Sequence, residues 1–259
     1  MMVAFVYTCM NTLPGIVHGV RQSSGMDEAQ WHKRMRVGFD TETTGVDTST
    51  ARIVTAALII RVPDTITEIK TWLLDPGVEI PPETTAVHGI TTEHAREHGQ
   101  PAAEGLDEIA EALAEHLRNE VPVVVFNASF DLPLLEAELE RHGLPSLIDR
   151  VGTQHYPVLD PLVLDRWVDR FRKGKRNLGA LTEHYGVVVE DELHSADVDV
   201  LAMLDVLEEM SRRWPQIGTT DLNQLRAVQA NAHRDWATNF NEYLASKGIQ
   251  REPIPTTWL

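Results

Sequence analysis

The sequence contains a single cysteine, Cys9, among 259 residues. An internal disulfide is therefore excluded, and such sparse use of cysteine is typical of a reducing compartment. No stretch reaches the roughly 18 uninterrupted apolar residues of a membrane-spanning helix. Residues 1–20 are mildly apolar, but they lack a basic start and contain Pro14 and Gly15, which disfavours a secretion signal. These absences predict a cytoplasmic protein with no membrane partner.

Basic side chains are also scarce, since 23 Lys and Arg face 39 Asp and Glu and the net charge is -16. This balance argues against a broad surface that coats nucleic acid, although metal ions could neutralise a local acidic site. One segment departs from the trend, and it is either a solvated surface or a contact for a phosphate backbone. Its basic residues are Arg166, Arg170, Arg172, Lys173, Lys175 and Arg176.

The chain divides into three regions by its pattern. Residues 1–33 show no clear periodicity, so we expect a flexible N-terminal extension. Residues 34–213 carry regular structure and should form one domain, since a hydrophobic share of 42% can build a core. Residues 214–259 are expected to form a helical extension and tail. Within it, the side chains of Trp236, Phe240 and Tyr243 fall on one side of a helix and should dock on the domain.

The order of expected elements indicates the fold class. Alternating Val37 and Phe39 predict a strand that ends at a Thr-Thr-Gly turn, and residues 52–61 and 67–74 predict two more strands in an antiparallel meander. A continuous apolar run at residues 122–126 predicts a buried strand. We expect an α/β domain with a mixed sheet flanked by helices. The expected helices span residues 103–117, 131–142, 161–171, 177–185, 195–213 and 222–245.

Asp40 and Glu42 lie two positions apart on the first expected strand, so their side chains should share one face. Two carboxylates on one face repel each other unless a cation lies between them. Their hard oxygen atoms suit Mg²⁺ or Mn²⁺, and paired ions about 4 Å apart commonly serve phosphodiester cleavage. The alternative is an ordinary polar turn after a strand.

Two further motifs could complete such a site. Asp131 follows the buried strand of residues 122–126 and opens a helix, with Asn127 and Phe130 placed to shape a nucleotide pocket. His194 precedes a helix that would hold Asp199, and a histidine with a pKa of roughly 6.5 suits a general base. The alternatives are an Asp that complements a helix dipole, a core Phe130, and a surface histidine beside an ordinary helix acid.

A weaker signal lies at His88, Gly89 and Ile90. A glycine beside polar residues permits close approach of the backbone to a sugar or base. The alternative is a simple turn before a helix that begins near Thr91.

In this order, the motifs resemble the DEDDh branch of the DnaQ-like 3′→5′ exonucleases. The matching patterns are Asp-x-Glu-x-Thr-Gly at 40–45, Asn-x-x-Phe-Asp at 127–131 and His-x-Ala-x-x-Asp at 194–199. The family includes the proofreading epsilon subunit of bacterial DNA polymerase III, ribonuclease T and oligoribonuclease. The resemblance covers about residues 37–210. Phe126 departs from it, because many members carry histidine before the asparagine.

The resemblance implies a ribonuclease H-like fold in the domain of residues 34–213. It also implies that four carboxylates hold two Mg²⁺ or Mn²⁺ ions while His194 deprotonates the attacking water. The terminal nucleotide would be bound by the segment from His88 to Ile90 and by residues of the other motifs. The implied metal ligands are Asp40, Glu42, Asp131 and Asp199, and the implied substrate contacts are Thr41, Thr44, His88, Gly89, Ile90, Asn127 and Phe130.

The leading hypothesis is removal of nucleoside monophosphates from the 3′ end of single-stranded DNA, in repair or proofreading. An oligoribonuclease-like enzyme that trims RNA is an alternative, since the metal site does not select the sugar. A DNA polymerase partner is another expectation, weakened because residues 214–259 show no convincing Gln-x-x-Leu-x-Phe motif. A catalytically idle interaction module of the same fold is disfavoured, because no ligand of the motif pattern is lost.

Overall fold

The computed structural model describes residues 28–63, 65–189 and 193–259. Most of the expected N-terminal extension, residues 1–27, lies outside the described part. Its last residues form a 3₁₀ helix, η1 (Glu28–Lys33), in which Trp31 is 1% exposed. The Trp31 Nε1 donates a hydrogen bond of 3.1 Å to the carbonyl of Ile217, so this end of the segment packs against the body of the protein.

A mixed sheet forms the centre of the molecule, as the sequence predicts. The first three strands make the expected antiparallel meander, and the others run parallel to their neighbours. The described residues form a six-stranded sheet in the order β4-β3-β2-β1-β5-β6. The strands are β1 (Arg36–Thr43), β2 (Ile53–Val62), β3 (Thr65–Asp75), β4 (Gln100–Pro101), β5 (Val123–Val124) and β6 (Val158–Leu159).

Each region predicted to be helical contains a helix, and several short helices join them. None of the described helices is long and apolar enough to cross a membrane. The helices are α1 (Pro82–His88), α2 (Thr92–His98), α3 (Ala102–Arg118), α4 (Ala128–Arg141), α5 (Leu147–Val151), α6 (Pro161–Val168), α7 (Leu178–Tyr185), α8 (Ala196–Arg213), α9 (Pro215–Thr219) and α10 (Leu222–Ser246).

Two helix boundaries differ from the prediction by three residues. Helix α4 begins three residues earlier than expected, so Asp131 lies within its first turns instead of opening it. Helix α6 ends at Val168 instead of Phe171, because the following segment folds back on a buried carboxylate. There Arg172 Nη2 donates a hydrogen bond of 2.9 Å to Asp165 Oδ2, and Arg176 contacts the same oxygen.

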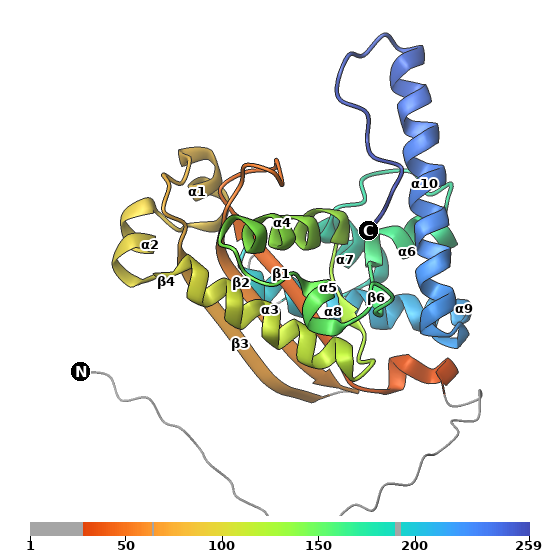
Figure 1. Ribbon diagram of the computed structural model, residues 1–259. Helices are drawn as coiled ribbons and strands as arrows, with labels where there is room; N and C mark the ends of the chain where they lie inside the picture. The colour runs from red at the N-terminus through yellow and green to blue at the C-terminus, as the bar shows by residue number, and fades with distance from the viewer. Residues whose placement is uncertain (1–27, 64, 190–192) are drawn as a thin grey trace, which may run out of the picture.

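Helices cover both faces of the sheet (Figure 1). Helices α3 and α4 pack against one face, where Val37 and Phe39 of β1 join the core. Helix α8 packs against the other face, over Ala57 and Ile59 of β2. The resulting three layers leave the carboxyl end of β1 between α4 and α8.

The C-terminal helix α10 docks on the domain by a different stripe from the one predicted. Its buried residues are Leu225, Gln229, His233, Ala237 and Leu244. Of the three aromatic rings expected to dock, Trp236 contacts α6 through Arg166, whereas Tyr243 is 52% exposed. The aromatic stripe is therefore only partly a docking surface, because it lies beside the buried stripe on the helix.

Candidate active site

The centre of the site is the carboxyl end of β1, where a glycine permits close helix packing. Gly38 lies two residues before Asp40 on the same face of the strand. A Cβ atom on Gly38 would lie 2.5 Å from Val200 Cγ1 and 3.0 Å from Leu204 Cδ1 of α8. The missing side chain therefore lets the first turns of α8 approach β1 and bring Asp199 to the strand.

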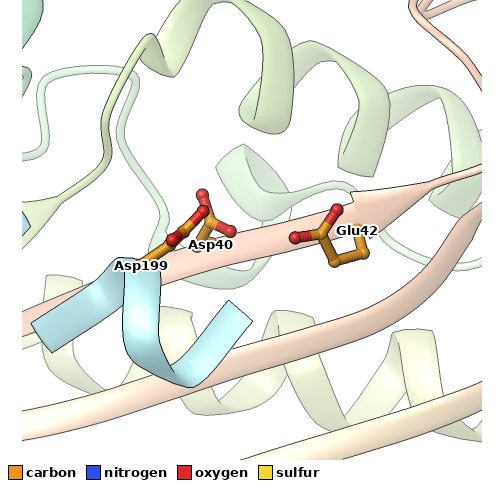
Figure 2. Close-up of side chains that lie close together, drawn as sticks. All are labelled: Asp40, Glu42 and Asp199. Atoms are coloured by element: carbon orange, nitrogen blue, oxygen red, sulfur yellow. The ribbon is translucent and has the colours of Figure 1, made fainter. Parts of the chain in front are cut away.

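Three carboxylates meet at this point, with ligand oxygens within 4.8 Å of one another. Asp40 and Glu42 come from β1, and Asp199 comes from α8. Figure 2 shows the carboxylates of Asp40 and Asp199 facing each other, with the Glu42 carboxylate beside them along the strand. The prediction that strand and helix supply ligands to one place agrees with this geometry.

Asp131 reaches the site from α4, on the other side of β1. Its side chain is 3% exposed, and Asp131 Oδ1 accepts a hydrogen bond of 2.6 Å from Thr41 Oγ1. It is not one of the three clustered carboxylates, but its charge acts on the pKa of Asp40. Thr41 thus orients the fourth predicted ligand, a role that the motif alone does not reveal.

Burial makes all four groups reluctant to ionise, and mutual repulsion within the cluster adds to this effect at Asp40 and Glu42. Burial raises the pKa of Asp40 well above its usual range, and the charges of Asp131, Asp199 and Glu42 raise it further. Burial raises the pKa of Glu42, and the charges of Asp199 and Asp131 raise it further, to about 7. Burial also raises the pKa of Asp131 to about 7, against the hydrogen bond from Thr41. Burial raises the pKa of Asp199 too. Such a cluster is stabilised in its ionised form by a cation.

A cleft of about 410 Å³ opens over these carboxylates. It brings together most of the residues singled out in the sequence, and it adds Phe126, Leu162, Arg176 and Asn177. Arg176 belongs to the basic segment noted in the sequence, but Leu162 gave no signal there. The predicted residues that line the cleft are Asp40, Thr41, Glu42, Asn127, Phe130, Asp131, His194 and Asp199.

His194 lies on the loop directly before α8, as predicted, and its backbone has a positive φ of 91°. Its backbone N–H donates a hydrogen bond of 3.1 Å to Asp199 Oδ1. The carboxylate of Asp199 is therefore tied to the loop that carries the histidine. The exposed imidazole lines the mouth of the cleft, in a position to exchange protons with solvent.

The buried side chain of Asp160 accepts hydrogen bonds from the backbone of the turn at Asn127. Asn127 adopts a left-handed conformation with φ 62°, which asparagine tolerates better than most residues. Asp160 Oδ1 accepts a hydrogen bond of 3.0 Å from the Asn127 N–H, and its Oδ2 accepts one of 3.0 Å from the Ala128 N–H. Sequence reasoning missed Asp160; its only signal was an Asp between an apolar run and Pro161, typical of a helix N-cap.

The remaining predicted substrate contacts lie outside the cleft lining. His88 ends α1 and Gly89 caps it in a left-handed conformation with φ 78°. His88 Nδ1 accepts a hydrogen bond of 3.1 Å from the Ile90 N–H, while its Nε2 is buried without a partner among the described residues. Thr44 is engaged in the turn after β1, where its Oγ1 accepts a hydrogen bond of 2.9 Å from the Arg52 N–H.

The donor set fits a hard divalent cation. Carboxylate oxygens are the ligands that Mg²⁺ and Mn²⁺ prefer. Three of them converge at Asp40, Glu42 and Asp199, and burial raises the pKa of each. Among the described residues, no ion pair joins a lysine or arginine to these carboxylates.

Comparison with known proteins agrees with this geometry. Residues 37–207 match the RNase T model of exonucleases. The chain is 31% identical over 191 residues to a PolC-type DNA polymerase III of Streptococcus thermophilus, covering 73% of this chain and 12% of the polymerase. It is similar to the structure of Escherichia coli exonuclease I in complex with a dT13 oligonucleotide, with a TM-score of 0.57, 18% identity, and coverage of 71% of this chain and 42% of that one.

A moderately thermophilic exonuclease I from Methylocaldum szegediense also superposes, with a TM-score of 0.54 and 23% identity over 71% of this chain and 42% of that one. The chain thus spans 12% of the polymerase and less than half of these exonucleases. The structural neighbours confirm the predicted ribonuclease H-like fold. The chain belongs to the RNase T family of exonucleases, the DnaQ-like family that its motifs resemble.

Proposed function

We propose that the protein is a metal-dependent 3′→5′ exonuclease that releases nucleoside monophosphates from single-stranded DNA. The observation that carries this proposal is the convergence of four carboxylates and His194 on one cleft. Family membership supports the reaction class, and the oligonucleotide bound to the structurally similar exonuclease I supports a single-stranded substrate.

Asp40, Glu42, Asp131 and Asp199 would hold two Mg²⁺ or Mn²⁺ ions. When bound, such ions lower the pKa of water and stabilise the negative charge that develops during phosphodiester cleavage. Asp40 is one of the three clustered carboxylates, and the charges of Asp131, Asp199 and Glu42 all raise its pKa. Because it interacts with each of the other three acids, we assign it contacts to both ions.

In the proposed reaction, the imidazole of His194 accepts the proton of the attacking water. Its exposed position lets the proton leave to solvent after each turnover. Thr41 keeps the Asp131 carboxylate in place through its hydrogen bond of 2.6 Å. Asn127 and Phe130, which line the cleft, would contact the terminal nucleotide there. Thr44 and the segment from His88 to Ile90, which lie outside the cleft lining, would contact the same nucleotide from the turns after β1 and α1.

Oligomers labelled at the 5′ end test this proposal. With Mg²⁺ or Mn²⁺, purified protein should produce a ladder of products shortened one nucleotide at a time, and EDTA should stop the reaction. Oligomers of DNA and RNA compared at equal length identify the preferred sugar, and faster RNA cleavage would favour the RNA-trimming alternative. Immediate release of the labelled 5′ nucleotide would contradict the direction.

Proofreading beside a DNA polymerase is the second candidate, favoured by the 31% identity to a PolC-type polymerase. A proofreading enzyme should remove a mismatched primer terminus faster than a matched one when a polymerase is present. Equal rates would leave the stand-alone enzyme as the better description. We infer a cytoplasmic location for either candidate, as expected from the single cysteine.

A further inference from the structure

A second hollow of about 420 Å³ lies between α6, the segment of residues 169–176 and α10. Figure 1 shows α10 standing beside α6 at one end of the sheet. Only part of this hollow belongs to the family domain, because α10 follows the matched residues 37–207. The hollow is lined by Arg166, Arg170, Phe171, Arg176, Asp235 and Trp236, among others.

The hollow is next to the catalytic cleft, because Arg176 lines both depressions. Its guanidinium is fixed by Asp165 and by a hydrogen bond of 2.6 Å from Nη2 to the carbonyl of Asp169. A strand with its 3′ end at the carboxylates could therefore leave the cleft past a rigid, positively charged edge.

The charge of the hollow is opposite to that of the whole protein. Three arginines line it, while the net charge of the chain is -16. Arg166 Nε is buried without a hydrogen-bond partner among the described residues. The one opposing acid in the lining, Asp235, has Arg234 beside it at 3.8 Å. A basic hollow on an acidic protein favours a polyanion over a protein surface of mixed charge.

Aromatic rings accompany these charges. Phe171 is 87% exposed and has the Arg170 guanidinium 5.7 Å from its ring centroid. Trp236 lies under Arg166, whose Cζ is 3.4 Å from the ring centroid. An exposed ring beside arginines is the arrangement on which bases of single strands stack while phosphates are neutralised. Without a bound base, the apolar ring of Phe171 stays in contact with water, which is unfavourable.

We propose that this hollow binds the nucleotides that precede the 3′ end of a single-stranded nucleic acid. Phe171 stacks on a base and Arg170 contacts the adjacent phosphates, while Arg166 and Trp236 form the rigid wall. The orientation of the strand, with its 3′ end at the carboxylates, rests on the proposed function. The binding of a single strand to the hollow does not. The proposal makes the basic segment, together with helix α10 that follows the matched residues 37–207, a substrate-holding surface.

Fluorescence anisotropy in EDTA tests binding without turnover, with oligothymidylates of about 4 and about 16 nucleotides. The full chain should bind the longer oligomer at least about tenfold more tightly. The double variant Arg170→Ala, Phe171→Ala should lose this gain and keep its affinity for the short oligomer. The control Arg96→Ala, Ile69→Ala removes an exposed arginine and an apolar side chain that is 53% exposed, both outside the hollow, and should behave as wild type.

Equal affinity of the wild type for both lengths, or unchanged binding by the double variant, would overturn the proposal. An altered oligomeric state of the double variant with unchanged oligomer binding would assign the hollow to a second copy instead. Trimming of the short oligomer with Mg²⁺ is measured in parallel. If the protein trims the oligomer but binds both lengths equally, the exonuclease function is supported and binding in the hollow is rejected. If it binds the longer oligomer more tightly but does not trim, binding in the hollow is supported and the exonuclease function is rejected.

Discussion

At Glu42, burial and the charges of Asp199 and Asp131 act in the same direction and raise the pKa from 4.5 to about 7. The folded protein therefore retains a proton that the unfolded chain releases near pH 4.5. Between these values the native state binds more protons, so its free energy of unfolding falls as the pH rises. The protonated form of Glu42 contributes fully to the free energy of unfolding below about pH 4.5, and this contribution is lost above about pH 7.

Glu42→Gln should remove this dependence. Without metal, we expect the variant to exceed wild type in unfolding free energy at pH 8 by roughly 1 kcal/mol, after allowance for screening of a partly exposed group. At pH 5 the two should differ little. Urea unfolding at both pH values in EDTA measures the difference, and a gap that is the same at both would contradict the raised pKa. Using the variant as reference cancels contributions from other groups such as His88.

His194→Ala should lower the turnover rate by about 10²- to 10⁴-fold, the usual contribution of a general base. His194 contacts the clustered carboxylates through its backbone N–H, which alanine retains, so Mn²⁺ affinity measured by calorimetry should change little. His155→Ala is the matched control, because His155 is also exposed and lies outside the cleft. Wild-type turnover of the His194 variant would show that another group takes the proton.

For single residues, the sequence predicts which side chains lie close together when they belong to the same short motif. Asp40 and Glu42 share a strand face, and His194 and Asp199 share a helix start, so their proximity follows from local geometry. Asp160 could not be predicted as a support of the site. Its partners at Asn127 and Trp258 are 33 and 98 positions away, and only the fold brings them together.

The contact between β1 and α8 is the element-scale feature on which the carboxylate cluster depends. Gly38→Ala would place a Cβ atom 2.5 Å from Val200 Cγ1, and a branched valine on a helix has little freedom to turn away. We expect a loss of about 1–3 kcal/mol in unfolding free energy, as in other overpacked cores. Movement of α8 should also weaken Mn²⁺ binding by displacing Asp199.

Gly45→Ala is the control for this substitution, because no atom lies within 4 Å of a Cβ at that position. Chemical denaturation and Mn²⁺ calorimetry on both variants check the prediction. Equal stability and equal metal affinity of Gly38→Ala and wild type would show that α8 is not held against β1 at this point.

Elements with a strong apolar pattern could be predicted, and those without one could not. Strands β1 and β2 and helix α8 have runs of buried residues, and they were predicted near their observed bounds. Strand β5 was predicted from its apolar run, although it forms over two residues only. Helix α1 has no buried residue, so its sequence offered no periodicity. Strands β4 and β6 contain two residues each, and their pairing depends on neighbours distant in sequence.

Across the whole molecule, the C-terminal tail returns to the core. Trp258 is 4% exposed, and its Nε1 donates a hydrogen bond of 3.4 Å to Asp160 Oδ2. Gln229 of α10 reaches the same place, accepting a hydrogen bond of 2.7 Å from the Asp160 N–H. Residues after the family domain thus support the turn that carries Asn127 and precedes Asp131.

Trp258→Ala should reduce the free energy of unfolding by about 3 kcal/mol, as expected for loss of a buried tryptophan. Trp258→Phe, which keeps most of the packing and removes only the N–H, should lose less. Tyr243→Ala serves as a control at a ring that is 52% exposed. Urea denaturation measures all three, and a Trp258→Ala variant as stable as the control would show that the tail is not part of the core.

The most direct test of the account is the rate of nucleotide release from a single-stranded oligomer by wild type and by Asp40→Asn, with Mg²⁺ and with EDTA. Asparagine keeps the size of the side chain and removes one charge from the carboxylate cluster. We predict metal-dependent release by wild type and none by the variant, whose metal-free fold should be at least as stable because repulsion is reduced. Equal rates for the two proteins, or release by wild type in EDTA, would contradict the account.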